Sequence, residues 1–347
     1  MESYYCNTLP RELRQSYHVL LEGLLSLDAS ISLPRLSDAE LADLFALVRL
    51  DHPEIFYVSG FSYRFRPGAE SLEFLPDYLF PKKQIEDHRR AIEARVRRLT
   101  AAAAQLDEKG RELYVHDFIC TNVRYDKLKK PYSHEVIGPL TQGVGVCEGI
   151  AKTVKLLCNA LGLPCIVAFS EAAPEKGIKY RHAWNLVMIG GKYYHLDATF
   201  DRTLSESGQI RYDYFNLGDA SLFRDHEAYV WKVPACPDNS RSYYIENKLS
   251  FTKPEVLESR LKQCAKKGKP LVFQWRGGYL TREVLAQLCA LAEKAGAAQG
   301  KSSAVSLNWP QAVLTVSYSA EGQNILRMED ANEGEAPLSI SSSFSDK

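Results

Sequence analysis

Residues 141–169 read TQGVGVCEGIAKTVKLLCNALGLPCIVAF, and this stretch carries the clearest structural signal in the chain. Two glycines interrupt regular structure just before Cys147, and apolar residues then recur at the spacing of one helix face up to Leu161. A glycine and a proline follow, which end the helix, and the next apolar run is typical of a strand. Cys147 is therefore predicted to lie in the first turn of a helix.

A cysteine at the start of a helix is suited to nucleophilic chemistry. The unpaired backbone amides and the positive end of the helix dipole stabilise a thiolate, which is the reactive form. The same amides can bind the oxyanion of a tetrahedral intermediate. Most free cysteines are core residues instead, and Cys158 and Cys165 in the apolar runs fit that description. Cys147 differs because glycines flank it and Glu148 follows it, so its position favours a function, provided that a base lies nearby.

Residues 181–201, RHAWNLVMIGGKYYHLDATFD, contain the expected base. Two β-rich runs flank a Gly-Gly pair, which readily adopts the positive φ angles of a two-residue hairpin turn. If Ile189 pairs with Lys192 across that turn, His182 and Asp197 lie on one face of the hairpin as diagonal neighbours. Their α-carbons would be roughly 7–8 Å apart, within reach of an imidazole–carboxylate hydrogen bond. A slip of one residue would separate them, so the prediction depends on the turn.

Together these residues predict a site with a cysteine nucleophile. Cys147 is the expected nucleophile, His182 the base, and Asp197 the carboxylate that fixes the histidine tautomer and stabilises its imidazolium form. Trp184, on the same face, is a candidate to shield the pair from water and to bind substrate. A lone histidine or aspartate here would more often be an ordinary strand or surface residue, but the combination with a cysteine at a helix start favours catalysis.

Three other histidines compete for the role of base. His195 shares the hairpin face, but it lies only two positions from Asp197 on the same predicted strand, and it is the main rival. His134 and His226 fall on predicted loops or helix starts, where the sequence assigns them no partner. We expect neither of these two to be the base.

The composition of the whole chain narrows the function further. Over 347 residues, 43 basic residues are balanced by 43 acidic ones, which gives no indication of a nucleic acid or an anionic membrane as partner. No secretory signal is visible, and no run of about 20 apolar residues occurs. The eight cysteines are scattered without a CxxC pair, which favours a reducing, cytoplasmic location. We therefore expect neither a metal nor another cofactor.

The patterns around this region predict further elements and a division into domains. The expected domains are a helical N-terminal lead-in packed on the core (1–107), the core itself (108–248), a small C-terminal α/β unit (249–330) and a disordered tail (331–347). The expected helices cover 10–25, a segment that starts at Ser37 with Glu40 completing a capping box, 82–106 with a solvated arginine-rich face, 108–123, 254–267 and 281–295. The expected strands lie within 51–68, 270–275, 303–309 and 312–318.

The order of Cys147, His182 and Asp197 in this context resembles the transglutaminase-like cysteine-hydrolase superfamily, and specifically its bacterial members of transglutaminase-core type. The resemblance covers residues 112–231 and is carried by GVCEGIAK, LGLPCIVAF, RHAWNLVMI and KYYHLDATFD, with NVRYD upstream and YDYFN downstream. It implies an α+β fold with a papain-like core, in which the helix of the nucleophile packs on an antiparallel sheet bearing the histidine and the aspartate.

The resemblance also implies acyl chemistry. The thiolate attacks a peptide or side-chain carboxamide, ammonia or an amine leaves, and water or another amine resolves the thioester. Such enzymes take their second oxyanion donor from a side chain near the nucleophile or in an adjacent loop. Gln142 and Tyr125 are the candidates in this chain.

Three functions remain open on the sequence. The first is a cysteine hydrolase of peptide or glutamine-type amides, with water as acceptor, because no dedicated amine-acceptor signature is present. The second is a protein-glutamine amine transferase, for which no calcium loop of the D-x-[DN]-x-[DN]-G kind is found. The third is a non-catalytic module that binds peptide on the same fold. All three predict a peptide or protein partner, and the sequence leaves the oligomeric state open.

Overall fold

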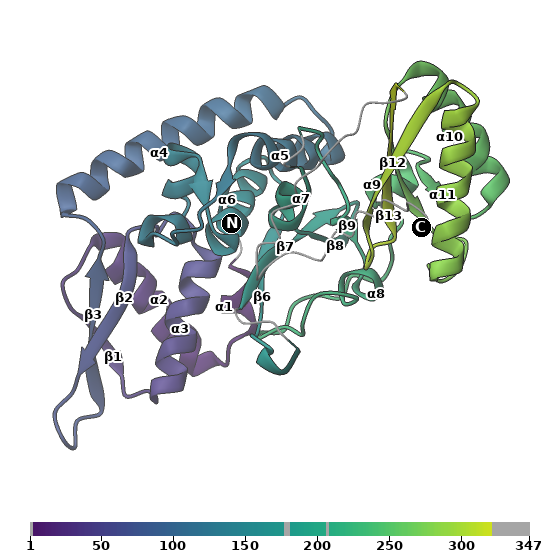
Figure 1. Cartoon of the computed structure of the whole chain (residues 1–347). Helices are drawn as coiled ribbons and strands as arrows, with labels where there is room; N and C mark the ends of the chain where they lie inside the picture. The colour runs from purple at the N-terminus through teal and green to yellow at the C-terminus, as the bar shows by residue number, and fades with distance from the viewer. Residues whose placement is uncertain (1–2, 177–180, 206–207, 321–347) are drawn as a thin grey trace. The chain divides into compact units, whose positions relative to one another are not determined.

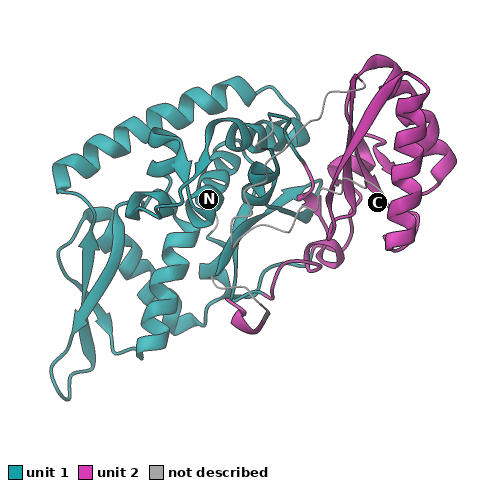
Figure 2. Cartoon of the chain, viewed as in Figure 1, with its two compact units in different colours: residues 1–171, 181–211, 229–235 teal, residues 172–180, 212–228, 236–347 magenta. Residues whose placement is uncertain are grey.

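The structure is a computed structural model of the chain, and it describes residues 3–176, 181–205 and 208–320. The described chain forms two compact units, which Figure 2 distinguishes by colour. Unit 1 consists of residues 1–171, 181–211 and 229–235, and unit 2 of residues 172–180, 212–228 and 236–347.

The N-terminal part of unit 1 combines helices with a small antiparallel sheet (Figure 1). Its elements are α1 (Tyr4–Thr8), α2 (Arg11–Ser26), β1 (Ile31–Pro34), α3 (Asp38–Asp51), β2 (Val58–Arg64), β3 (Ser71–Tyr78) and α4 (Lys82–Ala103), and the sheet order is β1-β3-β2. Helix α3 begins with the predicted capping box: the Ser37 hydroxyl accepts from the Glu40 amide, and the Glu40 carboxylate accepts from the Ser37 amide. Strands β1 and β3 were not predicted from the sequence, since both lie outside the segment 51–68 that was expected to form strands.

The central part of unit 1 packs a helix against antiparallel strands. Its elements are α5 (Glu108–Asn122), β4 (Arg124–Tyr125), a 3-10 helix (Pro131–His134), a π-helix (Gly138–Gln142), β5 (Val144–Gly145), α6 (Cys147–Ala160), β6 (Cys165–Ser170), β7 (His182–Ile189), β8 (Lys192–Leu196) and α7 (Ala198–Leu204). Strands β6, β7 and β8 are neighbours in that order, and α6 packs against β6 and β7. This helix–sheet layer forms the core of unit 1.

The N-terminal helices are tied to that core by buried hydrogen bonds. The Tyr5 hydroxyl donates to the Val167 carbonyl in β6 at 2.7 Å. The buried carboxylate of Asp51, at the end of α3, accepts from the amides of Tyr5 and Cys6 and from the Tyr17 hydroxyl. A buried carboxylate needs such donors because burial removes it from water, and here they join three helices at one point.

The predicted register of the hairpin is confirmed. Ile189 pairs with Lys192, and Gly190 and Gly191 have φ angles of 57° and 77°, which only glycine adopts without strain. The pairing stops earlier than expected, at Leu196, because Asp197 leaves the strand and caps α7.

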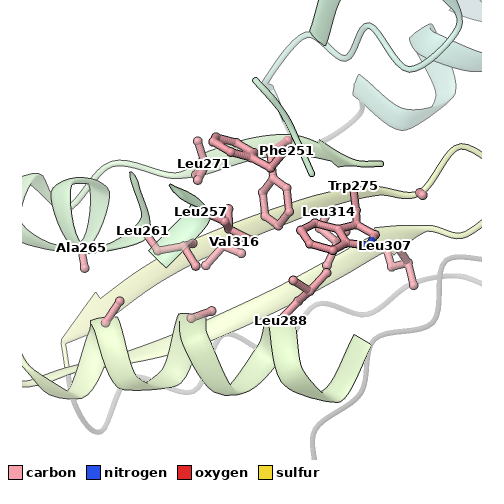
Figure 3. Packing of buried hydrophobic residues seen from close by; sticks show 14 residues of the cluster. Phe251, Leu257, Leu261, Ala265, Leu271, Trp275, Leu288, Leu307, Leu314 and Val316 are labelled. Atoms are coloured by element: carbon pink, nitrogen blue, oxygen red, sulfur yellow. The ribbon is translucent and has the colours of Figure 1, made fainter. Parts of the chain in front are cut away.

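Unit 2 contains a four-stranded sheet with helices α10 and α11. Among the described residues, the elements of this unit are a 3-10 helix (Pro174–Lys176), β9 (Phe215–Leu217), α8 (Asp219–Leu222), α9 (Tyr243–Glu246), β10 (Ser250–Phe251), α10 (Pro254–Lys267), β11 (Leu271–Trp275), α11 (Arg282–Ala297), β12 (Lys301–Asn308) and β13 (Val313–Ala320). The sheet order is β10-β11-β13-β12, and Figure 3 shows the apolar side chains that pack between this sheet and the two helices. The helices and strands predicted after residue 250 are therefore confirmed within one or two residues, whereas β10 was not expected.

Some predictions are not tested by these elements. The predicted tail, 331–347, and the end of the predicted C-terminal unit lie outside the described residues. The other predicted domain boundaries remain predictions. Within the described ranges, no helix is both long enough and apolar enough to cross a membrane.

Candidate active site

Cys147 is the first residue of α6. The preceding residue, Val146, has no side chain that could cap the helix, so the first amides of α6 are left without a capping group. Cys147 is partly exposed, whereas Cys158 and Cys165 are buried. A hydrogen bond with Cys165, together with burial, raises the pKa of the Cys158 thiol, as befits an inert core cysteine. Cys147 thus combines solvent access with free helix amides.

Two backbone contacts position the start of α6. Strand β5 pairs in parallel with β4, so that Tyr125 lies opposite Gly145, and the Val146 amide donates to the Ser133 carbonyl at 3.0 Å. Gly149 then passes close to the same carbonyl: a β-carbon at this position would lie 2.2 Å from the Ser133 oxygen. Only glycine fits there without displacement of the backbone, which explains the glycine two positions after Cys147.

His182 and Asp197 are in direct contact. The distance between His182 Nε2 and Asp197 Oδ2 is 2.6 Å, and the Asp197 side chain is fully buried. The other carboxylate oxygen of Asp197 accepts from the amides of Thr199 and Phe200, at 2.9 and 3.0 Å. Asp197 therefore caps α7 with one oxygen and orients His182 with the other.

The environment of His182 favours its charged form. Burial works against the charge, but the Asp197 carboxylate, its hydrogen bond and a hydrogen bond with Cys147 outweigh it and raise the pKa of His182 to about 10. Because Nε2 faces Asp197, Nδ1 is the ring nitrogen left for the Cys147 sulfur. The structure thus brings together the three residues predicted as nucleophile, base and carboxylate.

Trp184 and His195 form a buried group beside this histidine. The Trp184 indole stacks near His182 with ring centres 5.9 Å apart, and its Nε1 donates to His195 Nδ1 at 3.1 Å. The other ring nitrogen of His195 lies 3.2 Å from the Tyr229 hydroxyl. Since both nitrogens of His195 face other partners and the residue is fully buried, the geometry favours His182 over this rival as the base.

The two candidate oxyanion donors lie in different surroundings. Tyr125 is partly exposed on β4, next to the strand that leads into Cys147. Gln142 is exposed at the end of the π-helix, and its amide donates to the Thr141 hydroxyl at 3.3 Å. Both residues remain candidates for the second oxyanion donor.

The sequence assigned no partner to His134 or His226, and both have one. His134 Nδ1 lies 3.4 Å from a carboxylate oxygen of Glu148. His226 belongs to unit 2, where its Nδ1 lies 2.9 Å from Asp225.

Behind the nucleophile lies a network of charged side chains that was not predicted from the sequence. Lys152, fully buried on α6, contacts Glu148 at 2.7 Å and Glu135 at 2.9 Å, and Arg49 of α3 contacts both acids. Burial alone would raise the pKa of Glu148, but Lys152, His134 and Arg49 overcome it and hold the pKa well below its usual range. This network anchors the first turn of α6 to α3 and to the segment before the π-helix.

One part of this network could have been found in the sequence. Glu148 and Lys152 are four positions apart in a predicted helix, the spacing of a favourable ion pair. The other partners, Arg49 and Glu135, are far away along the chain and have no local signal.

Part of the chain is similar to known proteins. Residues 93–198 match the model of the transglutaminase-like superfamily, and the matched range includes Cys147, His182 and Asp197. No curated protein matches the chain. Among solved structures, a TGase is similar at 15% identity and a TM-score of 0.29, over 49% of this chain and 50% of its own. A candidate cysteine protease from Cytophaga hutchinsonii is similar at 19% identity and a TM-score of 0.25, over 40% of this chain and 62% of its own.

Proposed function

Because the chain is a member of the transglutaminase-like superfamily, we propose that it is a cysteine-dependent acyl-transfer enzyme that hydrolyses peptide or glutamine-type amides. The observation that supports the proposal is the contact chain from the Cys147 thiol through His182 to the buried Asp197 carboxylate. Cys147 is the nucleophile, His182 the general base and acid, and Asp197 the residue that orients the imidazole.

The proposed reaction begins with a thiolate–imidazolium pair. The Cys147 proton moves to His182 Nδ1, and the sulfur attacks the carbonyl carbon of the amide, so that a C–S bond forms and the carbonyl oxygen becomes an oxyanion. When the tetrahedral intermediate collapses, the C–N bond breaks, and His182 gives its proton to the departing amine or ammonia. Water then attacks the thioester, His182 accepts a proton from it, and the carboxylic acid leaves as the sulfur regains its charge.

The oxyanion requires donors that are already in place. The uncapped amides at the start of α6 point out of the helix end that carries the positive end of its dipole. They serve as the first hydrogen-bond donors to the oxyanion. We propose the Tyr125 hydroxyl as the second donor, because β4 runs beside the strand that ends at Gly145, two residues before Cys147. Trp184 limits the access of water to the His182–Asp197 pair, which strengthens their interaction.

The finer predictions about the molecule are part of the same proposal. We propose that α6 and the strands β6 to β8 form a papain-like core, with the helical segment before residue 108 as a lead-in. The substrate is a peptide or a protein. The eight cysteines are free thiols, and we propose a reducing, cytoplasmic location for the protein.

The test is the rate at which iodoacetamide alkylates Cys147 between pH 5 and 9, followed by peptide mass spectrometry in the wild type and in His182→Ala. An activated pair predicts fast labelling of Cys147 that persists below neutral pH and is lost in the variant. The partly exposed Cys264 and Cys289 of unit 2 serve as internal controls.

Labelling of Cys147 no faster than that of these two controls, with no change in His182→Ala, would contradict the catalytic proposal and favour a binding module. A second measurement separates the acceptors. Release of ammonia from casein without incorporation of a fluorescent primary amine indicates hydrolysis, whereas efficient amine incorporation indicates an amine transferase.

A further inference from the structure

Unit 2 contains a pocket that the proposed acyl chemistry does not use. It encloses about 920 Å³, near the upper end of the range of small-ligand sites. Its walls come from three segments of the chain: the region around α8 and α9, the end of β11 with the loop after it, and the turn between β12 and β13. All of these segments belong to unit 2, so the pocket is a property of this unit.

The charge of the pocket is positive. Arg224 and Arg276 line it, and no aspartate or glutamate is among its lining residues in the described chain. Arg224 donates to the Pro310 carbonyl at 3.3 Å, and Arg276 donates to the Ser250 hydroxyl at 2.6 Å. In the part of the chain that the structure describes, neither guanidinium forms an ion pair with a carboxylate. Their positions are fixed by neutral acceptors, and their charge remains available for a ligand.

The pocket also has aromatic walls. Tyr279 is 95% exposed and Trp309 is 41% exposed, which is unusual for such large rings unless they contact a partner. Trp275, at the end of the apolar cluster of Figure 3, is buried, and among the described residues its indole N–H has no acceptor. A buried donor without an acceptor is destabilising, and a ligand carbonyl or carboxylate oxygen would satisfy it.

We propose that this pocket binds an acidic peptide segment. Glutamate or aspartate side chains of the ligand pair with Arg224 and Arg276, a backbone carbonyl accepts from the Trp275 indole, and neighbouring side chains pack on Tyr279 and Trp309. Guanidinium groups suit carboxylates because they donate two parallel hydrogen bonds. Unit 2 is then a recognition unit that gives the chain a preference for acidic polypeptides.

The choice of a peptide, and not another anion, rests on the proposed function and on the pocket itself. The substrate proposed for Cys147 is a peptide or a protein, so a peptide is the ligand consistent with that function. A nucleic acid could also stack on the aromatic rings, but its phosphates call for a broader basic surface than two arginines, in a chain whose formal net charge is zero. A free inorganic anion would leave the aromatic walls uncovered.

The experiment measures binding without turnover, in the full chain carrying Cys147→Ala. Two fluorescein-labelled heptapeptides of glycine, alanine and leucine are compared by fluorescence anisotropy, one with three glutamates and one with three glutamines at the same positions. We expect the glutamate peptide to bind at least about tenfold more tightly, and a rise in salt concentration to weaken it.

Variants of the pocket locate the binding. Arg224→Gln and Arg276→Gln should each weaken the glutamate peptide by about tenfold, which corresponds to the loss of one charge-assisted pair. Trp309→Ala should weaken both peptides to a similar degree. Arg260→Gln is the matched control, because this exposed arginine on α10 belongs to unit 2 but does not line the pocket, and it should change nothing.

Equal binding of the two peptides, absence of binding, or binding that survives both arginine substitutions would overturn the inference. Tighter binding of a labelled oligothymidylate than of the glutamate peptide would overturn it in favour of a nucleic acid. The result is separate from catalysis: a wild-type chain without hydrolytic activity that still binds the glutamate peptide contradicts the proposed function alone, and an active chain that does not bind it contradicts only this inference.

Discussion

Two of the groups that combine a cysteine, a histidine and an aspartate in the described part of unit 1 differ in ways that matter for chemistry. In the first, Cys147 opens α6 and is partly exposed, and His182 contacts Asp197 through Nε2. In the second, Cys120 lies in the last turn of α5, with His116 and Asp201 beside it.

The second group lacks what a nucleophile needs. Cys120 Sγ and Asp201 Oδ2 approach the same nitrogen of His116, at 3.5 and 3.1 Å, so the ring cannot pass a proton between opposite sides. Cys120 sits at the negative end of its helix dipole, which disfavours a thiolate, and the whole group is buried. Burial works against charge on His116, but Cys120, Asp117 and Asp201 raise the pKa of this histidine well above its usual value. Contact between a cysteine, a histidine and an aspartate is therefore insufficient for a nucleophilic site. The end of the helix that carries the cysteine, the use of both ring nitrogens of the histidine and solvent access distinguish the two groups.

The largest expected difference between the groups is in turnover. Cys147→Ala should lower the rate of amide hydrolysis by roughly 10⁴-fold or more, because it removes the nucleophile. Cys120→Ala, a deletion of the same atoms, should leave the rate per folded molecule within about twofold. Ammonia release from casein, normalised to folded protein by circular dichroism, measures both. A comparable loss in the two variants would remove the distinction drawn here.

The second largest difference is expected between substitutions of the two aspartates, Asp197 and Asp201. Asp197→Asn keeps an oxygen to cap α7 but loses the charge that stabilises the imidazolium, so we expect kcat to fall by about 10³-fold. Asp201→Asn removes a partner of the buried His116 and should lower the free energy of unfolding by about 3 kcal/mol, with kcat unchanged. Steady-state kinetics and urea denaturation test the pair. The opposite assignment, with kcat falling only in Asp201→Asn, would point to the buried group.

Glycines in the two helices provide a third contrast. Gly149→Ala in α6 places a β-carbon 2.2 Å from the Ser133 carbonyl oxygen, which is backbone, so we expect a loss of about 2–3 kcal/mol and slower alkylation of Cys147. Gly110→Ala in α5 places a β-carbon 2.9 Å from an Asp107 carboxylate oxygen and 3.0 Å from the Leu106 β-carbon. Both neighbours are exposed side chains at the start of α5 that can shift, so the cost should be below about 1 kcal/mol. Similar midpoints of urea denaturation for both variants would contradict this reading of Gly149.

The smallest expected effect is in the pH dependence of stability. The pKa of His182 is raised from 6.5 to about 10 in the folded chain, so its contribution is fully present below pH 6.5 and is lost as the pH rises towards 10. His182→Gln should therefore make the decline of stability between pH 6.5 and 10 shallower. The remaining decline includes His116, whose pKa is shifted in the same direction. Thermal melts at several pH values measure the decline of stability with pH. The same decline in His182→Gln as in the wild type would refute the prediction.

Local patterns predicted those features that depend on neighbours in the chain. The Gly-Gly turn fixed the register that brings His182 towards Asp197. The capping box was predictable because its two residues, Ser37 and Glu40, are only three positions apart. The departure of Asp197 from its strand was not predicted, because the alternation of side chains along the sequence continues the strand pattern past this residue. In the structure the Asp197 side chain accepts from the amides of Thr199 and Phe200 and so begins a helix.

The sequence by itself determined that a cysteine opens a helix and that a hairpin carries a histidine and an aspartate on one face, because caps, glycine turns and apolar periods act over a few residues. Only the tertiary structure decided which charges are buried together. Arg49 and Glu135 are in contact although 86 positions separate them in the chain. Lys152 is fully buried, which is rare for a lysine, and its charge is paired with those of Glu135 and Glu148. Such pairs depend on long-range packing, which brings the desolvated charges together and leaves no periodic trace in the sequence.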